Sequence, residues 1–247
     1  MEISPSLLLL FEVPRSEVRA KLDELVSKQA DIHFDQMERL GDAGSVLIFN
    51  GLTFDCDFNP ESALKPERRK VFSTLGDDAI CSALAISLHS HIGHGLAVPE
   101  IAKAFLNFGA VCARNLQASA VVWQPTGLQA DTGYFLEVVQ SYVDGGVFPV
   151  LPIVDFIAEK PGYLRSKGLA DFCGQEFELQ SGQLDQQELI RRAIRLAHDL
   201  ATNGSIDDSQ EVADLDPANL IHLEPSDDGM LLHCRIASKS EQIEPLC

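Results

Sequence analysis

The sequence lacks the short motifs that mark the common catalytic and nucleotide-binding sites. It has no Gly-x-Ser-x-Gly, no glycine-rich loop followed by Lys-Ser or Lys-Thr, and no Gly-x-Gly-x-x-Gly. A serine or cysteine hydrolase needs its nucleophile at a sharp turn beside a histidine and an acid, and a phosphate cradle needs the glycines. The sequence therefore supports neither class, and we predict no catalytic residue.

Basic residues are few, with 19 Lys and Arg against 37 Asp and Glu, which gives a net charge of −18 at pH 7. Such a charge repels phosphate backbones, whereas nucleic-acid-binding proteins gather Lys and Arg on one face. We therefore expect no nucleic acid among the partners. A basic protein is the partner that this charge favours.

Long hydrophobic runs are also absent, since no apolar run approaches the roughly 20 residues needed to span a bilayer. The apolar run at residues 7–11 has no basic residue before it and is followed at once by Glu12 and Pro14, unlike a secretion signal. We therefore expect no membrane partner and a cytoplasmic location.

The six cysteines include no Cys-x-x-Cys pair. A disulfide framework is not expected in a chain of this length without an export signal. Most of these cysteines are expected to be small buried hydrophobic residues. We expect Cys247 to be the most exposed thiol.

The first 98 residues have the pattern of a ferredoxin-like lobe. The strongest local signal is Asn50-Gly51, a pair that tolerates the positive φ angles of a type I′ turn and joins two short strands. The other periodicities complete a β-α-β-β-α-β order. The expected elements are a strand at 7–13, a helix at 15–28, hairpin strands at 45–49 and 52–58, a helix near 77–88 and a strand near 92–98.

Residues 99–247 are expected to form a second α+β lobe. Pro99 can open a helix as its first residue, and Asp185 with Glu188 three residues later predicts a second helix start. The other expected elements are a helix at 132–143, strands at 120–123, 163–167, 176–180, 219–223 and 230–236, and an extended connection at 148–156. The predicted fold class is α+β with two ferredoxin-like (split βαβ) lobes at 1–98 and 99–247. A single mixed sheet that continues through both lobes is the open alternative.

An acidic segment at residues 205–228 lies within the second lobe and contains no Lys or Arg. One interpretation is a solvated loop that keeps the protein soluble. The other is a docking surface for a basic partner, with Asp207 and Asp208 as candidate contacts. The segment's eight acids are Asp207, Asp208, Glu211, Asp214, Asp216, Glu224, Asp227 and Asp228.

Four charged residues share one face of two expected strands. Glu176 and Glu178 alternate with Phe177 and Leu179, because side chains alternate along a strand. Arg165 and Lys167 have the same parity in the preceding strand. If these strands pair, the acids face the bases as cross-strand ion pairs. The functional alternative is a polar groove for a charged ligand.

His89, His91 and His94 form the densest group of potential metal ligands. Zinc sites on a helix usually place histidines four residues apart, whereas the offsets here are two and three. We therefore predict neither a metal site nor a cofactor. We interpret these histidines as incidental residues at a helix-to-strand junction.

Trp123 is the only tryptophan and ends an expected strand. Strand-to-loop junctions commonly bind ligands in α/β proteins, so Trp123 is a candidate ligand contact. The alternative is a core anchor whose indole N–H is satisfied.

Three patterns between residues 77 and 200 point to a known family. They are a helix running into a short strand at 91–98, the strand that ends in Trp123, and Gly168-Leu169-x-x-Phe172 followed by Glu176-x-Glu178 and a long helix. In these patterns the chain resembles the bacterial family catalogued as domain of unknown function 4261, although here Cys173 stands between that Phe and the next Gly. The resemblance implies one continuous α+β protein from a bacterium. Because that family has no established activity, it implies no catalytic residues.

These observations favour a non-enzymatic, cytoplasmic interaction or regulatory protein. Acidic proteins of this size can serve as immunity or antitoxin partners that neutralise basic enzymes, and the charge suggests such a role. An enzyme with its site near His89, His91, His94 and Trp123 is the first alternative. A small-molecule-binding module between the lobes, lined by the four charged strand residues, is the second.

Overall fold

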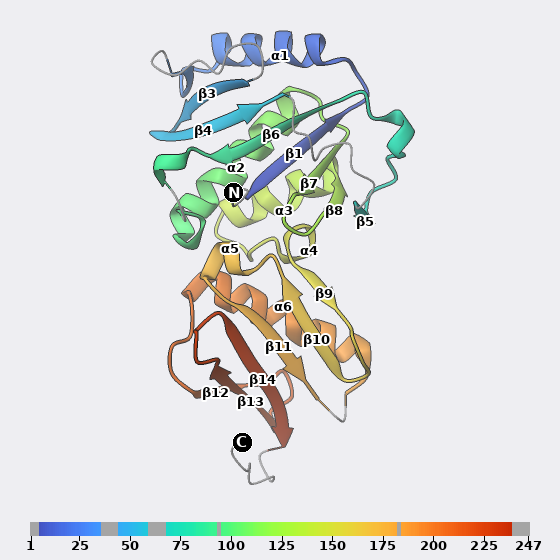
Figure 1. Cartoon of the computed structure of the whole chain (residues 1–247), viewed down its shortest axis with the longest axis vertical. Coiled ribbons are helices and arrows are strands. Elements are labelled where there is room, and N and C mark those ends of the chain that lie inside the picture. Colours follow the sequence, from blue (N-terminus) through green and yellow to red (C-terminus); the bar gives the residue numbers. More distant parts are fainter. Residues whose placement is uncertain (1–4, 36–43, 59–67, 93–94, 182–183, 239–247) are drawn as a thin grey trace. The chain divides into compact units, whose positions relative to one another are not determined.

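Two β-sheets form the framework of the protein, seen in a computed structural model that describes residues 5–35, 44–58, 68–92, 95–181 and 184–238 (Figure 1). The chain divides into unit 1, Met1–Ile153, and unit 2, Val154–Cys247. Unit 1 holds an eight-stranded sheet and unit 2 a six-stranded sheet, and each combines strands with helices. The predicted α+β class is therefore confirmed. None of the described strands belongs to both sheets.

The sheet of unit 1 is built around β1 (Ser6–Phe11), all six residues of which are buried. The predicted boundary at residues 98–99 falls inside this unit, because β7 (Ala120–Trp123) pairs antiparallel with β1. The strand order is β2-β3-β4-β6-β1-β7-β8-β5. The other bounds are β2 (Ile32–Phe34), β3 (Gly44–Phe49), β4 (Leu52–Asp57), β5 (Arg69–Phe72), β6 (Ser82–Leu88) and β8 (Leu128–Asp131).

One face of this sheet is covered by α2 (Pro99–Asn115) through an aromatic cluster. Phe108 stacks on Phe54 of β4 with ring centroids 4.4 Å apart, and Phe105 meets Trp123 edge to face at 6.1 Å. Gly109 lets the helix approach β1, since a Cβ there would lie 2.5 Å from Leu7 Cδ1. The predicted helix that opens at Pro99 is therefore confirmed.

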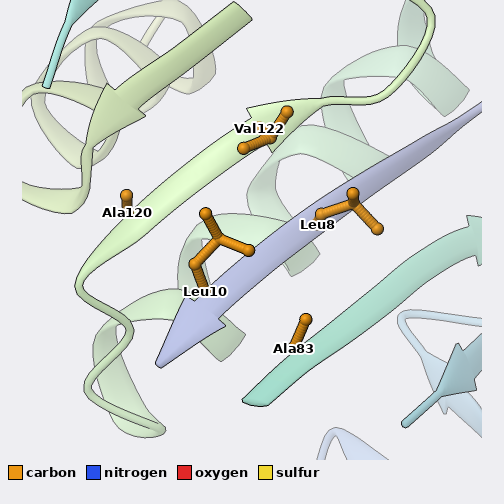
Figure 2. Close-up of a cluster of buried hydrophobic side chains, with 5 residues drawn as sticks. All are labelled: Leu8, Leu10, Ala83, Ala120 and Val122. Atoms are coloured by element: carbon orange, nitrogen blue, oxygen red, sulfur yellow. The ribbon is translucent and has the colours of Figure 1, made fainter. Parts of the chain in front are cut away.

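The opposite face carries a second, smaller cluster (Figure 2). Leu8 and Leu10 of β1 lie between Ala83 of β6 and the β7 residues Ala120 and Val122, all of them buried. Because successive side chains of β1 alternate, one short strand contributes to the cores on both sides of the sheet.

The helix predicted near 77–88 is wrong. The chain forms a 3₁₀ turn at Asp77–Ala79 and then β6, which pairs with β1 on one side and β4 on the other. Ala and Leu have high intrinsic helix propensity, but bonding to two neighbouring strands overrides it. The strand predicted near 92–98 is also wrong, because Ser90–Ile92 and Gly95–Ala97 are 3₁₀ turns. A ferredoxin-like arrangement is not confirmed.

Several local predictions are confirmed. Asn50 and Gly51 adopt φ angles of 50° and 80° in the hairpin between β3 and β4. The helices α1 (Arg15–Lys28) and α3 (Thr132–Val143) have the predicted bounds. One further local prediction is wrong. The connection predicted as extended at 148–156 contains one helical turn, α4 (Val150–Ile153), before β9 (Asp155–Ile157).

The sheet of unit 2 has the order β12-β13-β14-β11-β10-β9, and α6 (Gln186–Asn203) runs along it (Figure 1). Asp185 caps α6 by accepting a hydrogen bond from the Glu188 amide, as predicted. The remaining bounds are β10 (Tyr163–Lys167), α5 (Ala170–Cys173), β11 (Glu176–Gln180), β12 (Gln210–Ala213), β13 (Asn219–Pro225) and β14 (Leu231–Ser238).

Candidate functional site

The two faces of the unit 2 sheet differ sharply in polarity. On one face, Phe177, Leu232 and Leu223 are buried together with the apolar side of α6. On the other, the charged residues of β10 to β14 are exposed or half-buried. This second face is called the open face below. Among the described residues, this face carries more ionisable side chains than the apolar face of the same sheet.

Strand register aligns these residues into two rows across the open face. The first row runs through β13, β14, β11 and β10, and the second runs from β12 through the same four strands. The first row is Glu224, His233, Glu178 and Arg165, in which acids and bases alternate. The second row is Glu211, His222, Arg235, Gln180 and Tyr163.

Glu178 is the centre of the first row. Its carboxylate lies 3.6 Å from Arg165 Nη1 and 3.4 Å from His233 Nδ1. Burial and a hydrogen bond to this carboxylate raise the pKa of the Tyr163 hydroxyl to about 12. The predicted cross-strand pairing of Arg165 with Glu178 is therefore confirmed, and Glu178 holds three side chains in place.

Glu176 and Lys167 do not form the second ion pair that parity predicted. Glu176 instead accepts hydrogen bonds from Ser166 Oγ at 2.6 Å and from the amides of Gly168 and Ala170 at 2.6 and 3.1 Å. Lys167 lies opposite Asp155 of β9. Backbone pairing of β10 with β11 extends only from Tyr163 to Arg165. Beyond Arg165, alternation along the strands therefore does not decide which side chains face one another. Glu176 is therefore a structural residue that holds the β10–α5 turn.

The role of Glu176 can be measured by substitution. We expect Glu176→Ala to lower the free energy of unfolding by about 1–3 kcal/mol, because three donors lose their acceptor. Urea unfolding followed by circular dichroism measures this loss. Glu211→Ala is the matched control, since Glu211 is exposed and its one ion pair within the described residues is with His222 at 3.1 Å. An equal, small effect of both substitutions would contradict the assignment.

The acidic segment at 205–228 is not the single solvated loop that one interpretation predicted. It contains β12 and β13, and Asp214 is buried against Arg192 of α6, with Nε donating to Oδ1 at 2.7 Å. Asp207 and Asp208 are exposed, as both interpretations require. Only part of the predicted acidic surface is therefore available to a partner.

A buried glutamine fastens the two ends of this segment together. Gln175 Nε2 donates to the carbonyls of Ile206 and Gly229 at 2.9 and 2.8 Å, and its Oε1 accepts from the Ile206 amide at 2.9 Å. The turns that carry Asp207–Asp208 and Asp227–Asp228 are consequently held side by side. These two turns are called the acidic end of unit 2. Gln175 was not predicted as a site residue, because no local sequence pattern indicates contacts with residues this distant in the chain.

A groove of about 440 Å³ lies beside the turn between β13 and β14. Its wall combines residues of the open face with residues of the acidic end. The lining residues are Gln180, Glu224, Pro225, Ser226, Asp227, His233, Cys234 and Arg235. The last hairpin was predicted from the sequence, but its polar face was not. The signal for that face is the alternation of His233 and Arg235 with Leu232, Cys234 and Ile236.

In unit 1, the structure separates the predicted histidine and tryptophan site. His89 Nδ1 lies 2.7 Å from Asp55 Oδ1, and its ring lies 4.9 Å from that of His91. Asp55 lies on the face of β4 opposite to Phe54, whereas Trp123 is on the aromatic side beneath α2. The sheet therefore lies between His89 and Trp123. His94 lies outside the described residues.

Trp123 is buried in the core, as one of its two interpretations predicted. Its side chain is 1% exposed and contacts Phe105. A buried indole in the core is not accessible to a ligand. Trp123 is therefore a core residue rather than a binding residue.

Among the described residues, no group of three or more His, Cys, Asp or Glu side chains is arranged to hold a metal ion. None of the helices in that part of the chain has the length and apolarity that a bilayer span requires. No family model, curated protein or solved structure matches this chain.

Proposed function

We propose that this is a non-enzymatic interaction protein that binds a basic protein partner through the open face and the acidic end of unit 2. One observation carries the proposal: the second face of a six-stranded sheet bears ionisable side chains on every strand from β10 to β14 and is accessible to solvent. A sheet face of this kind offers a broad surface for a protein partner, and its charge pattern determines which partners are favoured.

The charge of unit 2 supports a basic partner. Acidic residues outnumber basic ones by 18 to 8 in residues 154–247. The acidic end adds Asp207, Asp208, Asp227 and Asp228 at one edge of the surface, where Gln175 holds them together. Complementary charge accelerates encounter with a basic protein and disfavours acidic ones. In this proposal the protein acts in the cytoplasm, in a regulatory, immunity or antitoxin role.

The resemblance to domain of unknown function 4261 remains part of the proposal. One of its three patterns, Gly168 to Glu178 with the helix that follows, lies in unit 2. It forms α5, β11 and α6, which support the open face. In this proposal, the residues of unit 2 that carry the resemblance support the docking surface.

Removing charge from the acidic end tests the proposed function. We expect Asp207→Asn/Asp208→Asn/Asp227→Asn to weaken binding of a fluorescein-labelled octalysine peptide about tenfold, because each exposed ion pair contributes a fraction of a kcal/mol. Fluorescence anisotropy at low and high salt measures the affinity. Asp228 is left unchanged, since it accepts bonds from Ser226 Oγ and the Met230 amide and so maintains the turn.

The matched control removes the same charge from unit 1. Glu12→Gln/Asp23→Asn/Asp31→Asn alters three exposed acids and leaves unit 2 intact. We expect this variant to bind like the wild type at about 150 mM salt, where distant charges are screened. Equal weakening by both variants, or an affinity that does not depend on salt, would show that the acidic end is not the docking surface.

A further inference from the structure

The groove beside the β13–β14 turn contains two opposite charges that have no ionic partner among the described residues. They are Glu224 of β13 and Arg235 of β14. The other cations of the two rows are engaged: Arg165 and His233 with Glu178, and His222 with Glu211. Glu224 and Arg235 are therefore available to an external ligand.

The register explains why these two groups remain apart from their neighbours. Glu224 lies opposite His233, but the His233 ring approaches Glu178 on the next strand. Arg235 lies between His222 and Gln180, neither of which is acidic. Each charge is thus bordered by side chains that are already paired or neutral.

Glu224 and Arg235 are diagonal neighbours on the open face, since Arg235 follows two residues after the cross-strand partner of Glu224. Diagonal neighbours on antiparallel strands are roughly 7–8 Å apart, a separation that one small molecule can bridge. The carboxylate and the guanidinium border the same groove of about 440 Å³. That volume is within the range of small-molecule sites.

We propose that this groove binds a small zwitterion with a primary ammonium and a carboxylate, the chemistry shared by free amino acids and short peptides. The guanidinium of Arg235 receives the ligand carboxylate, for which its fork of N–H donors is suited. Glu224 accepts hydrogen bonds from the ligand ammonium. Gln180, which also lines the groove, supplies an uncharged hydrogen-bonding group.

This inference goes beyond the docking of a basic protein and is tested at different residues, although Glu224 and Arg235 both lie on the open face. The docking surface is tested at Asp207, Asp208 and Asp227, whereas the ligand contacts are Glu224 and Arg235. Asp227 also lines the groove and stays unchanged in the experiment below. Either proposal can therefore fail while the other stands.

Titration calorimetry of the full chain with alanine, trialanine, N-acetyl-trialanine and trialanine amide tests the inference. We expect alanine or trialanine to bind with a Kd below about 1 mM. The acetylated peptide lacks the ammonium and the amide lacks the carboxylate. Each is expected to bind at least about tenfold more weakly than trialanine, because one charge-assisted contact is lost.

Two substitutions assign the two contacts. Arg235→Gln is expected to weaken trialanine about tenfold and to remove the difference between trialanine and its amide. Glu224→Gln is expected to remove the difference between trialanine and the acetylated peptide in the same way. Both residues are exposed, and neither side chain forms a hydrogen bond or an ion pair within the described residues. The variants should therefore unfold at the wild-type temperature.

Two matched controls and three outcomes complete the experiment. Lys167→Gln removes an exposed cation from the same face outside the groove, and Asp208→Asn removes an acid of the acidic end; both are expected to bind trialanine normally. Arg235→Lys is expected to restore part of the affinity lost in Arg235→Gln. Absence of binding by both alanine and trialanine overturns the inference. Equal binding of all three peptides, or unchanged discrimination in both glutamine variants, overturns it as well.

Discussion

Replacing Arg192 with methionine is expected to lower the free energy of unfolding by about 3–5 kcal/mol, because the substitution leaves a buried carboxylate without its counter-charge. The Asp214 side chain is fully buried, and Arg192 Nε donates to both of its oxygens at 2.7 and 3.0 Å. Arg192 Nη1 also bonds Glu188 at 2.8 Å. Urea unfolding followed by far-ultraviolet circular dichroism measures the loss.

Arg191→Met is the matched control for this substitution. Arg191 is the preceding residue of α6 and contacts the same Glu188 at 2.6 Å, but its side chain is 67% exposed. An exposed pair contributes less than about 1 kcal/mol. The double variant Arg192→Met/Asp214→Leu should recover most of the loss, since an apolar pair replaces a buried ion pair without leaving a charge. Similar destabilisation by Arg191→Met and Arg192→Met would contradict the assigned role.

The same pair makes the effect depend on pH. Burial alone would raise the pKa of Asp214, but hydrogen bonds from Arg192 and from the Leu215 amide outweigh burial and hold this pKa below its ordinary value. A carboxylate with a lowered folded pKa stabilises the protein above its unfolded pKa and loses that contribution as the pH falls through the folded value. The difference between wild type and Arg192→Met should therefore be largest at neutral pH and narrow below about pH 4.

Replacing Phe108 with alanine is expected to destabilise unit 1 by about 3–5 kcal/mol. Phe108 is fully buried, and its ring stacks on Phe54 at 4.4 Å and lies 5.3 Å from Phe49. Removal of the ring leaves a cavity where α2 covers the sheet, and the packed surroundings collapse only in part. Fluorescence of Trp123, which packs in the same layer through Phe105, reports the unfolding.

Phe72→Ala is the control for loss of an aromatic pair outside the core. Phe72 is 42% exposed at the edge strand β5 and lies 4.6 Å from the ring of Tyr134. We expect a cost below about 1.5 kcal/mol, because much of the surface is already in water. A cost for Phe108→Ala no larger than that for Phe72→Ala would show that the aromatic layer does not stabilise unit 1.

Local elements were predictable wherever one signal decided them. Asn50-Gly51 set a hairpin turn, and Asp185 capped α6 at the predicted residue. β10 and β11 also have the predicted bounds, because the alternation of polar and apolar residues along them agrees with a sheet that buries one face. The segment at 77–88 was mispredicted because its composition favours a helix while two neighbouring strands require an extended chain.

The candidate site was only partly predictable. The Arg165–Glu178 pair followed from parity, which alternation along a strand enforces. Glu176 departed from the prediction because the amides of Gly168 and Ala170 needed an acceptor. Trp123 and His89 appeared close to one another in the sequence argument, but the sheet separates them.

The sequence by itself determined the acidic charge, the α+β class, most local elements and the alternation that gives unit 2 one apolar and one polar face, since these depend on composition and on neighbours a few residues apart. Only the tertiary structure decided that β14 lies beside β11, that Gln175 joins two distant acidic turns and that Arg235 and Glu224 border one groove. The physical reason is that these relations depend on which strands pair, and strand pairing is set by the burial of the whole apolar face rather than by any local pattern.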